Sequence, residues 1–347
     1  MNIKPASKVT IKDIARELGI SPSTVTRALA GSSRIKAETV RRVRQKADAM
    51  GYVADSTARA MQSGTNALVG LLVPDIQNQF YATMARTVAK NCHRHGYQLV
   101  LSVTEDDPQV EEHHVRALVG ARCAGVLIVP AAEITSISCR MLFDIPTVQL
   151  IRSSEDLSAD GIGIDDRKAI YTATSYLLDL GHRRIGFLCG RSLLDTARAR
   201  LQGFENAFIE RGIPYDPELV QTGDPRTEHG REGALRLLSM RPCPTAILAG
   251  GAALTEGLLD AVNEQTDGAL SNLSLLGFGD SAALRWWQGG GLTTLDLPIS
   301  EMADAACARL FDRIGHPEDI HTKHTFSRFE AHIVLRGSTR SVTHPAG

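Results

Sequence analysis

One short segment near the start of the chain combines the residue types that contact nucleic acid. The stretch SPSTVTRALAG, residues 21–31, carries four hydroxyls and one guanidinium within seven positions: Ser21, Ser23, Thr24, Thr26 and Arg27. Hydroxyls at a helix N-terminus bind phosphate oxygens, and an arginine can donate two bonds to O6 and N7 of guanine. The same hydroxyls can also serve only as helix caps, so the surrounding elements must decide between the two interpretations.

Three short helices are expected around this segment, in residues 8–53. Thr10, with Asp13 three residues later, can cap a first helix that Gly19 ends. Pro22 suits the first position of a second helix, and AETVRRVRQKADAMG predicts a third. The tight GIS link between the first two helices is typical of a helix-turn-helix, whose second helix meets DNA. The expected core draws apolar residues from all three helices: Ile14, Leu18, Val25, Leu29, Val40, Val43 and Met50.

The charge of the chain is unevenly distributed. Residues 1–64 hold 12 lysines and arginines against 5 aspartates and glutamates, whereas the remaining residues hold 26 against 34. A basic head on an acidic body indicates a polyanionic partner for the head, although a merely solvated surface has the same composition.

No set of residues predicts catalysis, a metal site or a cofactor. The sequence has no G-x-S-x-G motif, no P-loop and no G-x-G-x-x-G that opens a helix. The histidines at 93, 95, 321 and 324 lack four converging ligands at a known spacing, so we interpret them as surface residues. The six cysteines form no C-x-x-C pair, which favours reduced packing residues in a cytoplasmic protein. We find neither a signal peptide nor a membrane-spanning run, and expect no membrane partner.

Beyond residue 66 the pattern changes to apolar runs that alternate with helical stretches. ALVGLLVPD, YQLVLSV and AGVLIVPA form one such set, and RRIGFLCG, TAILAG and LSLLGFGD form a second. Continuous apolar strands between amphipathic helices predict a parallel sheet covered on both faces. Two sets predict two lobes, with a ligand site between them at the carboxyl ends of the strands.

Three stretches carry a resemblance to a known family. VTIKDIARELGISPSTVTRALAG, GYVADSTARAM and GLLVPDIQNQFY resemble the LacI/GalR family of bacterial transcription regulators. The resemblance implies a small all-α helix-turn-helix head, joined by a hinge helix to a two-lobed α/β body with parallel sheets, like periplasmic binding proteins. It also implies that Pro22, Ser23 and Arg27 read bases. Since Pro22 has no donor, it can offer only apolar contact, and Arg27 is expected to carry most of the readout.

The hinge is expected in residues 54–66. Its polar composition alone is typical of a flexible linker. The resemblance implies instead a helix that forms on the operator, with Ala58 and Met61 against the DNA and Met61 as the wedge in the minor groove. Met61 stands where leucine is usual, and Ala54 and Asp55 replace a common Pro-Asn.

The effector-binding and dimerisation domain is expected to span residues 67–347. Lobe 1 would comprise about 67–163 and 293–325, and lobe 2 about 164–292 and 326–347. The resemblance implies three crossings between the lobes, which we place near Gly163, Leu292 and Phe326.

The resemblance also points to residues of the cleft. Phe80 and Tyr81 can stack on a ligand ring or belong to the core, and Arg200 matches an arginine that forks onto ligand oxygens. Arg152 is a second candidate, and Gly279 stands where the family commonly has an aspartate that grips sugar hydroxyls. A cleft that loses carboxylates and keeps two arginines should favour an anion, such as a sugar acid or a phosphorylated sugar.

The sequence therefore predicts a cytoplasmic transcription regulator, most simply a repressor. It would bind double-stranded operator DNA of near-palindromic sequence as a homodimer, with a small-molecule effector that gates operator affinity. Three alternatives stay open. They are a ligand-transport protein, an enzyme on a doubly wound fold, and a protein of this fold whose DNA binding is not gated.

Overall fold

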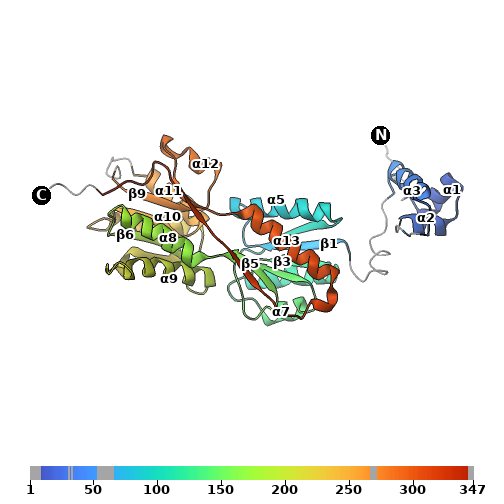
Figure 1. The fold of residues 1–347 in the computed structure, drawn as a ribbon, viewed down its shortest axis with the longest axis horizontal. Helices are drawn as coiled ribbons and strands as arrows, with labels where there is room; N and C mark the ends of the chain where they lie inside the picture. Colours follow the sequence, from blue (N-terminus) through green and yellow to red (C-terminus); the bar gives the residue numbers. More distant parts are fainter. Residues whose placement is uncertain (1–8, 30–31, 33, 53–65, 266–271, 343–347) are drawn as a thin grey trace, which may run out of the picture. The chain divides into compact units, whose positions relative to one another are not determined.

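The structure is a computed structural model that describes residues 9–29, 32, 34–52, 66–265 and 272–342 (Figure 1). The chain divides into two compact units, residues 1–66 and residues 67–347, which we call the head and the body.

The head contains three helices, as predicted. They are α1 (Ile11–Leu18), α2 (Pro22–Leu29) and α3 (Ala37–Ala49). The N–H of Thr10 donates to Oδ2 of Asp13 at 3.0 Å, and Gly19 ends α1 with a φ of 65°, where a side chain would be strained. The three helices enclose a small core of Ile14, Ala15, Val25, Ala28, Val43 and Ala47, with the other predicted core residues packed around it.

The body contains two six-stranded sheets, one in each lobe. The lobe 1 sheet has the order β11-β5-β4-β3-β1-β2, and the lobe 2 sheet has the order β12-β10-β9-β8-β6-β7. All neighbouring strands are parallel except β10 and β12. The bounds in lobe 1 are β1 Leu68–Val73, β2 Gln98–Val103, β3 Gly125–Ile128, β4 Thr147–Leu150, β5 Asp160–Ile164 and β11 Phe326–Phe329. Those in lobe 2 are β6 Ile185–Gly190, β7 Val220–Gly223, β8 Ala246–Ala249, β9 Ser274–Phe278, β10 Thr293–Asp296 and β12 His332–Val334.

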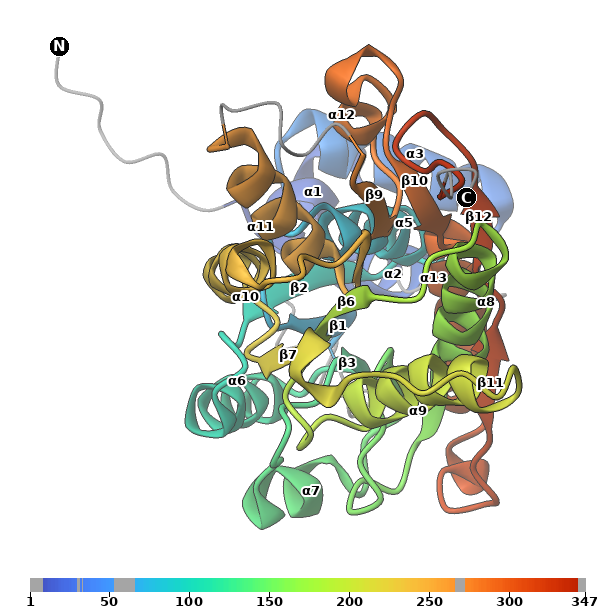
Figure 2. The same cartoon turned by 90° about the vertical axis from the view of Figure 1, so that its left-hand side faces the viewer.

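Helices cover both faces of each sheet (Figures 1 and 2). In lobe 1, α5 (Gln79–Arg94) and α13 (Ile299–Gly315) pack on one face, and α6 (Pro108–Gly120) and α7 (Ser136–Leu142) on the other. In lobe 2, α8 (Asp166–Asp179) and α9 (Asp195–Ile209) cover one face, and α10 (Thr227–Ser239) and α11 (Ala252–Asn263) cover the other. The short α12 (Ala282–Arg285) follows β9. This two-lobed, doubly covered arrangement is the predicted fold.

Two of the three crossings lie a few residues beyond their expected positions. The first follows β5, next to Gly163. The second follows β10, which pairs with β9 in lobe 2, so it lies at 297–298 rather than at Leu292. The third lies at 330–331, because β11, which starts at Phe326, pairs with β5 of lobe 1. β10 thus adds to the lobe 2 sheet before the second crossing, and β11 adds to the lobe 1 sheet before the third.

Glycines allow the helix pairs of lobe 2 to approach closely. A Cβ atom at Gly257 of α11 would lie 2.1 Å from the carbonyl oxygen of Thr227 at the start of α10. Only a residue without a side chain fits this contact between helices. Among the described helices, none is long and apolar enough to cross a membrane.

Candidate functional site

The outer face of α2 presents the predicted DNA-contacting side chains to solvent. Pro22, Ser23, Thr26 and Arg27 are exposed, whereas Val25 and Ala28 point into the head core. The helix therefore buries one narrow side and exposes the side chains of its N-terminal half to solvent. A helix needs this exposure to enter a major groove.

Some of the hydroxyls of α2 already make local hydrogen bonds. Ser21 Oγ accepts from the N–H of Thr24 at 3.1 Å and so caps the helix, and Thr26 Oγ1 donates to the carbonyl of Pro22 at 3.0 Å. Because a hydroxyl has one O–H donor, Thr26 must give up its bond to Pro22 before it can donate to a phosphate, whereas the cap bond does not use the O–H of Ser21. Arg27 is exposed, and its guanidinium is involved in none of the ion pairs found among the described residues. Ala58 and Met61, the expected hinge contacts, lie outside the described residues.

The body holds a cavity of about 670 Å³ between its lobes. Its walls come from segments that follow the carboxyl ends of strands in both sheets: Asp75 after β1, Asp106 after β2, Arg191 after β6 and Asp224 after β7. The predicted position of a ligand site at the strand ends therefore coincides with a cavity of suitable size for a small molecule.

Four of the five predicted effector residues line this cavity. They are Phe80, Tyr81, Arg152 and Arg200. The rings of Phe80 and Tyr81 meet edge to face with centroids 5.2 Å apart, and Tyr81 is largely buried, so the pair belongs both to the core and to the wall. Gly279 is not a lining residue. It follows Phe278, which is one, and adopts a φ of 85°.

The two predicted arginines are each neutralised by a carboxylate. Arg152, only 6% exposed, pairs with Asp106, and Arg200 Nε donates to Asp166 Oδ1 at 2.7 Å. Arg200 also donates to the carbonyl of Gly250 at 2.6 Å and lies over the ring of Phe278, with its Cζ 4.2 Å from the centroid. The expectation of a cleft that has lost its carboxylates is therefore not met. Seven carboxylates and four guanidiniums line the cavity.

Polar contacts join the two lobes across the mouth of the cavity. Asp106 of lobe 1 accepts from Arg191 of lobe 2 at 3.1 Å, and Arg191 also pairs with Asp224 at 3.2 Å. On another side, the N–H and hydroxyl of Ser153 donate to Asp195 Oδ2 at 2.9 and 2.7 Å. These contacts hold the lobes close together around the cavity.

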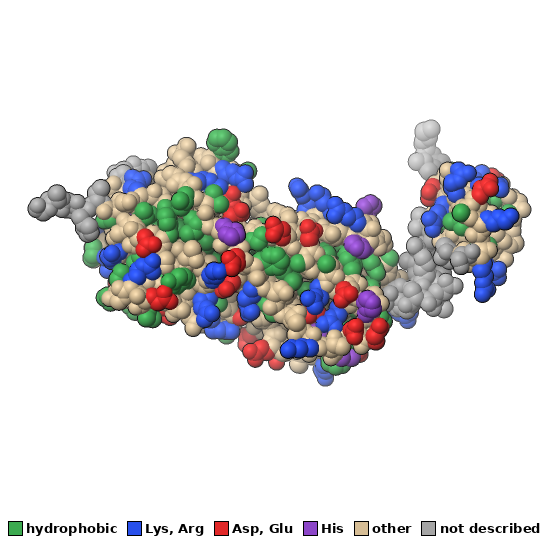
Figure 3. Space-filling view, in the orientation of Figure 1, with side chains coloured by type: hydrophobic (Ala, Val, Ile, Leu, Met, Phe, Trp, Pro, Cys, Tyr) green, Lys and Arg blue, Asp and Glu red, His purple; other side chains and the backbone are tan. Residues whose placement is uncertain are grey.

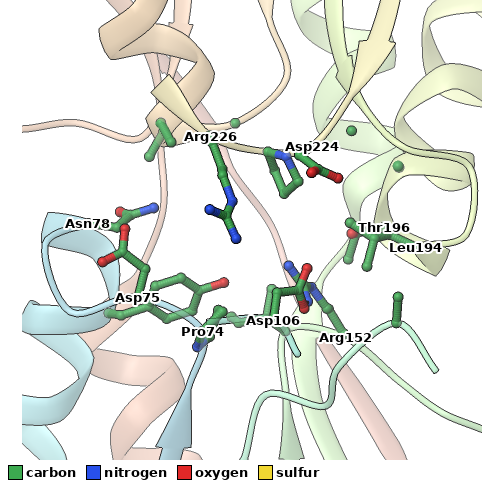
Figure 4. A pocket seen from close by; sticks show the side chains of 18 of the residues that line it. Pro74, Asp75, Asn78, Asp106, Arg152, Leu194, Thr196, Asp224 and Arg226 are labelled. Atoms are coloured by element: carbon green, nitrogen blue, oxygen red, sulfur yellow. The ribbon is translucent and has the colours of Figure 1, made fainter. Parts of the chain in front are cut away.

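Arg226 is a cavity residue that the sequence did not single out. It lies between β7 and α10, and its side chain is exposed. Figure 4 shows its guanidinium reaching into the open space, with Asp75 and Asn78 on one side and Thr196 on the other. Nη2 of Arg226 donates to the carbonyl of Glu105 in lobe 1 at 3.2 Å. These residues are far apart in the sequence and come together only when both lobes are folded. No local sequence motif could therefore predict that Arg226 lines the cavity.

A buried carboxyl lies on α6, the helix whose first residue, Pro108, lines the cavity. Glu111 of α6 is fully buried, and its Oε2 accepts from the N–H of Ala131 at 2.8 Å. Oε1 has no partner among the described residues. Burial raises the pKa of Glu111 to about 7, whereas the hydrogen bond from Ala131 opposes the rise.

Asp280 has a structural role. It bonds to Arg336 at 2.8 Å, to Arg285 at 3.2 Å and to Thr294 at 3.2 Å. Burial alone would raise the pKa of Asp280, but these partners outweigh burial and lower it.

Surface charge and metal-binding potential offer no second candidate site. On the face of the body shown in Figure 3, basic and acidic side chains are interspersed. Within the described ranges, no three histidines, cysteines or carboxylates gather where they could hold a metal ion.

Comparison with known proteins finds a family match in each of the two units. Residues 10–55 match the family described as bacterial regulatory proteins of the lacI family, and residues 174–339 match a periplasmic binding protein-like domain. The chain is 28% identical to the transcriptional repressor PurR of Haemophilus influenzae (strain PittGG), over 96% of this chain and 99% of PurR. It is 28% identical to the transcriptional regulator GalR of Salmonella typhimurium (strain SL1344), over 92% of this chain and 93% of GalR.

The fold agrees with these relationships. A solved structure of the lac repressor dimer, bound to operator and the anti-inducer ONPF, matches with a TM-score of 0.80 at 19% identity. The match covers 96% of this chain and 100% of that chain. The relatives are transcription regulators and not enzymes, in agreement with the expectation from sequence.

Proposed function

Because the chain belongs to the LacI/GalR family and is a DNA-binding transcriptional repressor, we propose that a small-molecule effector in the body cleft gates its operator binding. The observation that carries this proposal is the pairing of two sites in one chain. One unit exposes the outer face of α2, the second helix of the helix-turn-helix, and the other encloses a ligand-sized cavity between two lobes. Effector binding would bias the lobes between arrangements and so change operator affinity.

The proposed operator contacts lie on α2 and in the hinge. Arg27 and Ser23 would read bases, Pro22 would offer apolar contact, and Ser21, Thr24 and Thr26 would bind phosphates. Ala58 and Met61 would meet the minor groove. We propose that the protein acts as a homodimer, because two heads then read the two halves of a near-palindromic operator. The lac repressor of similar fold is a dimer on its operator.

Selection from random duplex DNA tests the operator proposal. The wild type, Arg27→Ala and the control Arg41→Ala would be compared at one salt concentration. Arg41 is an exposed arginine of α3, and its substitution removes the same charge as Arg27→Ala. We expect the wild type to enrich a near-palindromic sequence. Arg27→Ala should lose one base preference in each half of that sequence, whereas Arg41→Ala should enrich the same sequence as the wild type but bind it more weakly. If both variants bound DNA equally weakly and no sequence were enriched, the result would contradict specific base recognition by Arg27.

For the effector, we propose an anionic sugar derivative. Carboxylates of the cavity can accept bonds from sugar hydroxyls, aromatic residues can stack on a ring, and an arginine can bind an acidic group. Fluorescence anisotropy of labelled operator, with and without sugar acids and sugar phosphates, measures the gating directly. A compound that binds the body and leaves operator affinity unchanged would favour the alternative of an ungated DNA-binding protein. The proposal places the protein in the bacterial cytoplasm, on the nucleoid when bound to DNA.

A further inference from the structure

The four arginines that line the cavity differ in their partners. Arg152, Arg191 and Arg200 each form an ion pair with a carboxylate. Arg226 makes no ion pair within the described part of the chain, and the one hydrogen bond that its side chain makes there goes to a neutral carbonyl, that of Glu105. Because a guanidinium has five N–H donors, most of the donors of Arg226 stay available to a ligand.

The position of Arg226 suits it to bind a ligand group. Its side chain extends into the open part of the cavity (Figure 4). It belongs to lobe 2, yet it reaches the Glu105 carbonyl of lobe 1 at 3.2 Å, so a group bound there would touch both lobes. A planar carboxylate can accept two parallel bonds from one guanidinium, which fixes its orientation as well as its position.

The surrounding charge limits how negative the ligand can be. Asp75, Glu105 and Glu228 line the cavity without an ion pair among the described residues, and carboxylates outnumber guanidiniums in the whole lining. Among the described lining residues, Arg226 is the one arginine without an ion pair, so a dianionic phosphate would meet this negative field with a single free cation. A monoanionic carboxylate is matched by Arg226. The remaining carboxylates can accept hydrogen bonds from sugar hydroxyls.

We infer that the effector is a monoanionic sugar acid, whose carboxylate is bound by Arg226, and not a phosphorylated sugar. The inference rests on the proposed effector site in the cleft. It assigns the acid group to an arginine at the cavity mouth and not to Arg152 or Arg200, whose charges are already matched by Asp106 and Asp166.

Isothermal titration calorimetry on the full-length protein tests this assignment. The probes are D-gluconate, D-glucuronate and D-galacturonate, with D-glucose and D-galactose as neutral counterparts and D-glucose 6-phosphate as the dianion. We expect one or more of the acids to bind at least tenfold more tightly than its neutral counterpart and than the phosphate. Arg226→Ala should weaken acid binding at least tenfold and leave neutral sugars unaffected, and Arg226→Lys should restore part of the affinity.

The control is Arg236→Ala. Arg236 lies on α10, the helix that directly follows Arg226, and it is exposed. It donates to Gln221 at 2.9 Å and does not line the cavity, so its loss should leave acid binding unchanged. Preferential binding of a neutral sugar or of the phosphate would overturn the inference, and so would unchanged acid binding in Arg226→Ala.

Measurements of operator affinity distinguish the assignment of the ligand to Arg226 from the proposal that the ligand gates operator binding. An acid whose affinity depends on Arg226 but which does not alter operator affinity would support the ligand assignment and contradict gating. Operator release by a neutral sugar, with Arg226→Ala unaffected, would support gating and contradict the assignment. A panel in which no compound binds would count against both.

Discussion

The buried carboxyl of Glu111 should make the stability of the body depend on pH. Its pKa lies at about 7 in the folded protein, against 4.5 for an ordinary glutamate. Between these values the folded state holds a proton that the unfolded state has lost, so the free energy of unfolding falls as pH rises. The full difference corresponds to about 3 kcal/mol above pH 7, and it vanishes below about pH 4.5, where the carboxyl is protonated in both states.

Glu111→Gln removes this dependence while keeping the shape of the side chain. The amide oxygen can still accept from Ala131, and the amide group replaces the carboxyl oxygen that has no partner. In urea denaturation followed by circular dichroism, we expect the variant to exceed the wild type by up to about 3 kcal/mol at pH 8 and to match it near pH 4.5.

Glu112→Gln is the matched control. Glu112 accepts from Thr135 at 2.8 Å and from Arg116 at 2.9 Å, and these bonds lower its pKa, with the Thr135 bond as the larger cause. Its ionised form stabilises the fold above its ordinary pKa, and this contribution is lost as pH falls, so the control should be less stable than the wild type at pH 8. A Glu111→Gln variant that is no more stable than the wild type at pH 8, or equally shifted at both pH values, would refute the reasoning.

Three other substitutions test other parts of the structure. Asp280→Asn should lower the free energy of unfolding by about 1–3 kcal/mol at pH 7, because Arg336 loses a charged partner, and the loss should shrink at low pH as wild-type Asp280 is protonated; urea titrations at pH 7 and pH 3.5 measure this. Gly257→Ala should destabilise the protein by about 1–3 kcal/mol, since its Cβ would collide with the backbone of α10; thermal unfolding with equal stability would contradict the close packing. Trp286 is 80% exposed, so Trp286→Ser should fold normally, and we expect it to weaken the proposed homodimer; sedimentation equilibrium in which the dimer is unchanged would exclude this surface as part of the interface.

Local signals in the sequence predicted the elements well. Asp13 three residues after Thr10, and Gly19 after the last apolar position, set the limits of α1 because caps act within one helical turn. The apolar run from Leu68 to Val73 predicted β1, since a strand buried on both faces needs a continuous apolar sequence. Each of these features depends on neighbours a few residues away.

The charges of the cleft could not be predicted in the same way. Arg152 meets a carboxylate 46 positions earlier, and Arg200 meets one 34 positions earlier. Such pairs depend on how distant segments of the same lobe fold together, and no spacing along the chain predicts them. The same reason explains why Arg226 was missed: it becomes a cavity residue only when β7 and the end of β2 face one another.

The sharing of Asp106 between two arginines has a consequence for movement. When the lobes separate, Asp106 loses Arg191 but keeps Arg152 in its own lobe, and Arg191 keeps Asp224 in its own lobe. Opening therefore leaves Asp106, Arg152 and Arg191 each with a counter-ion. An uncompensated buried charge, which makes breaking a salt bridge costly, does not arise among these three residues. The two arrangements can then lie close in free energy, and a ligand needs to supply only a small preference to change which of them predominates.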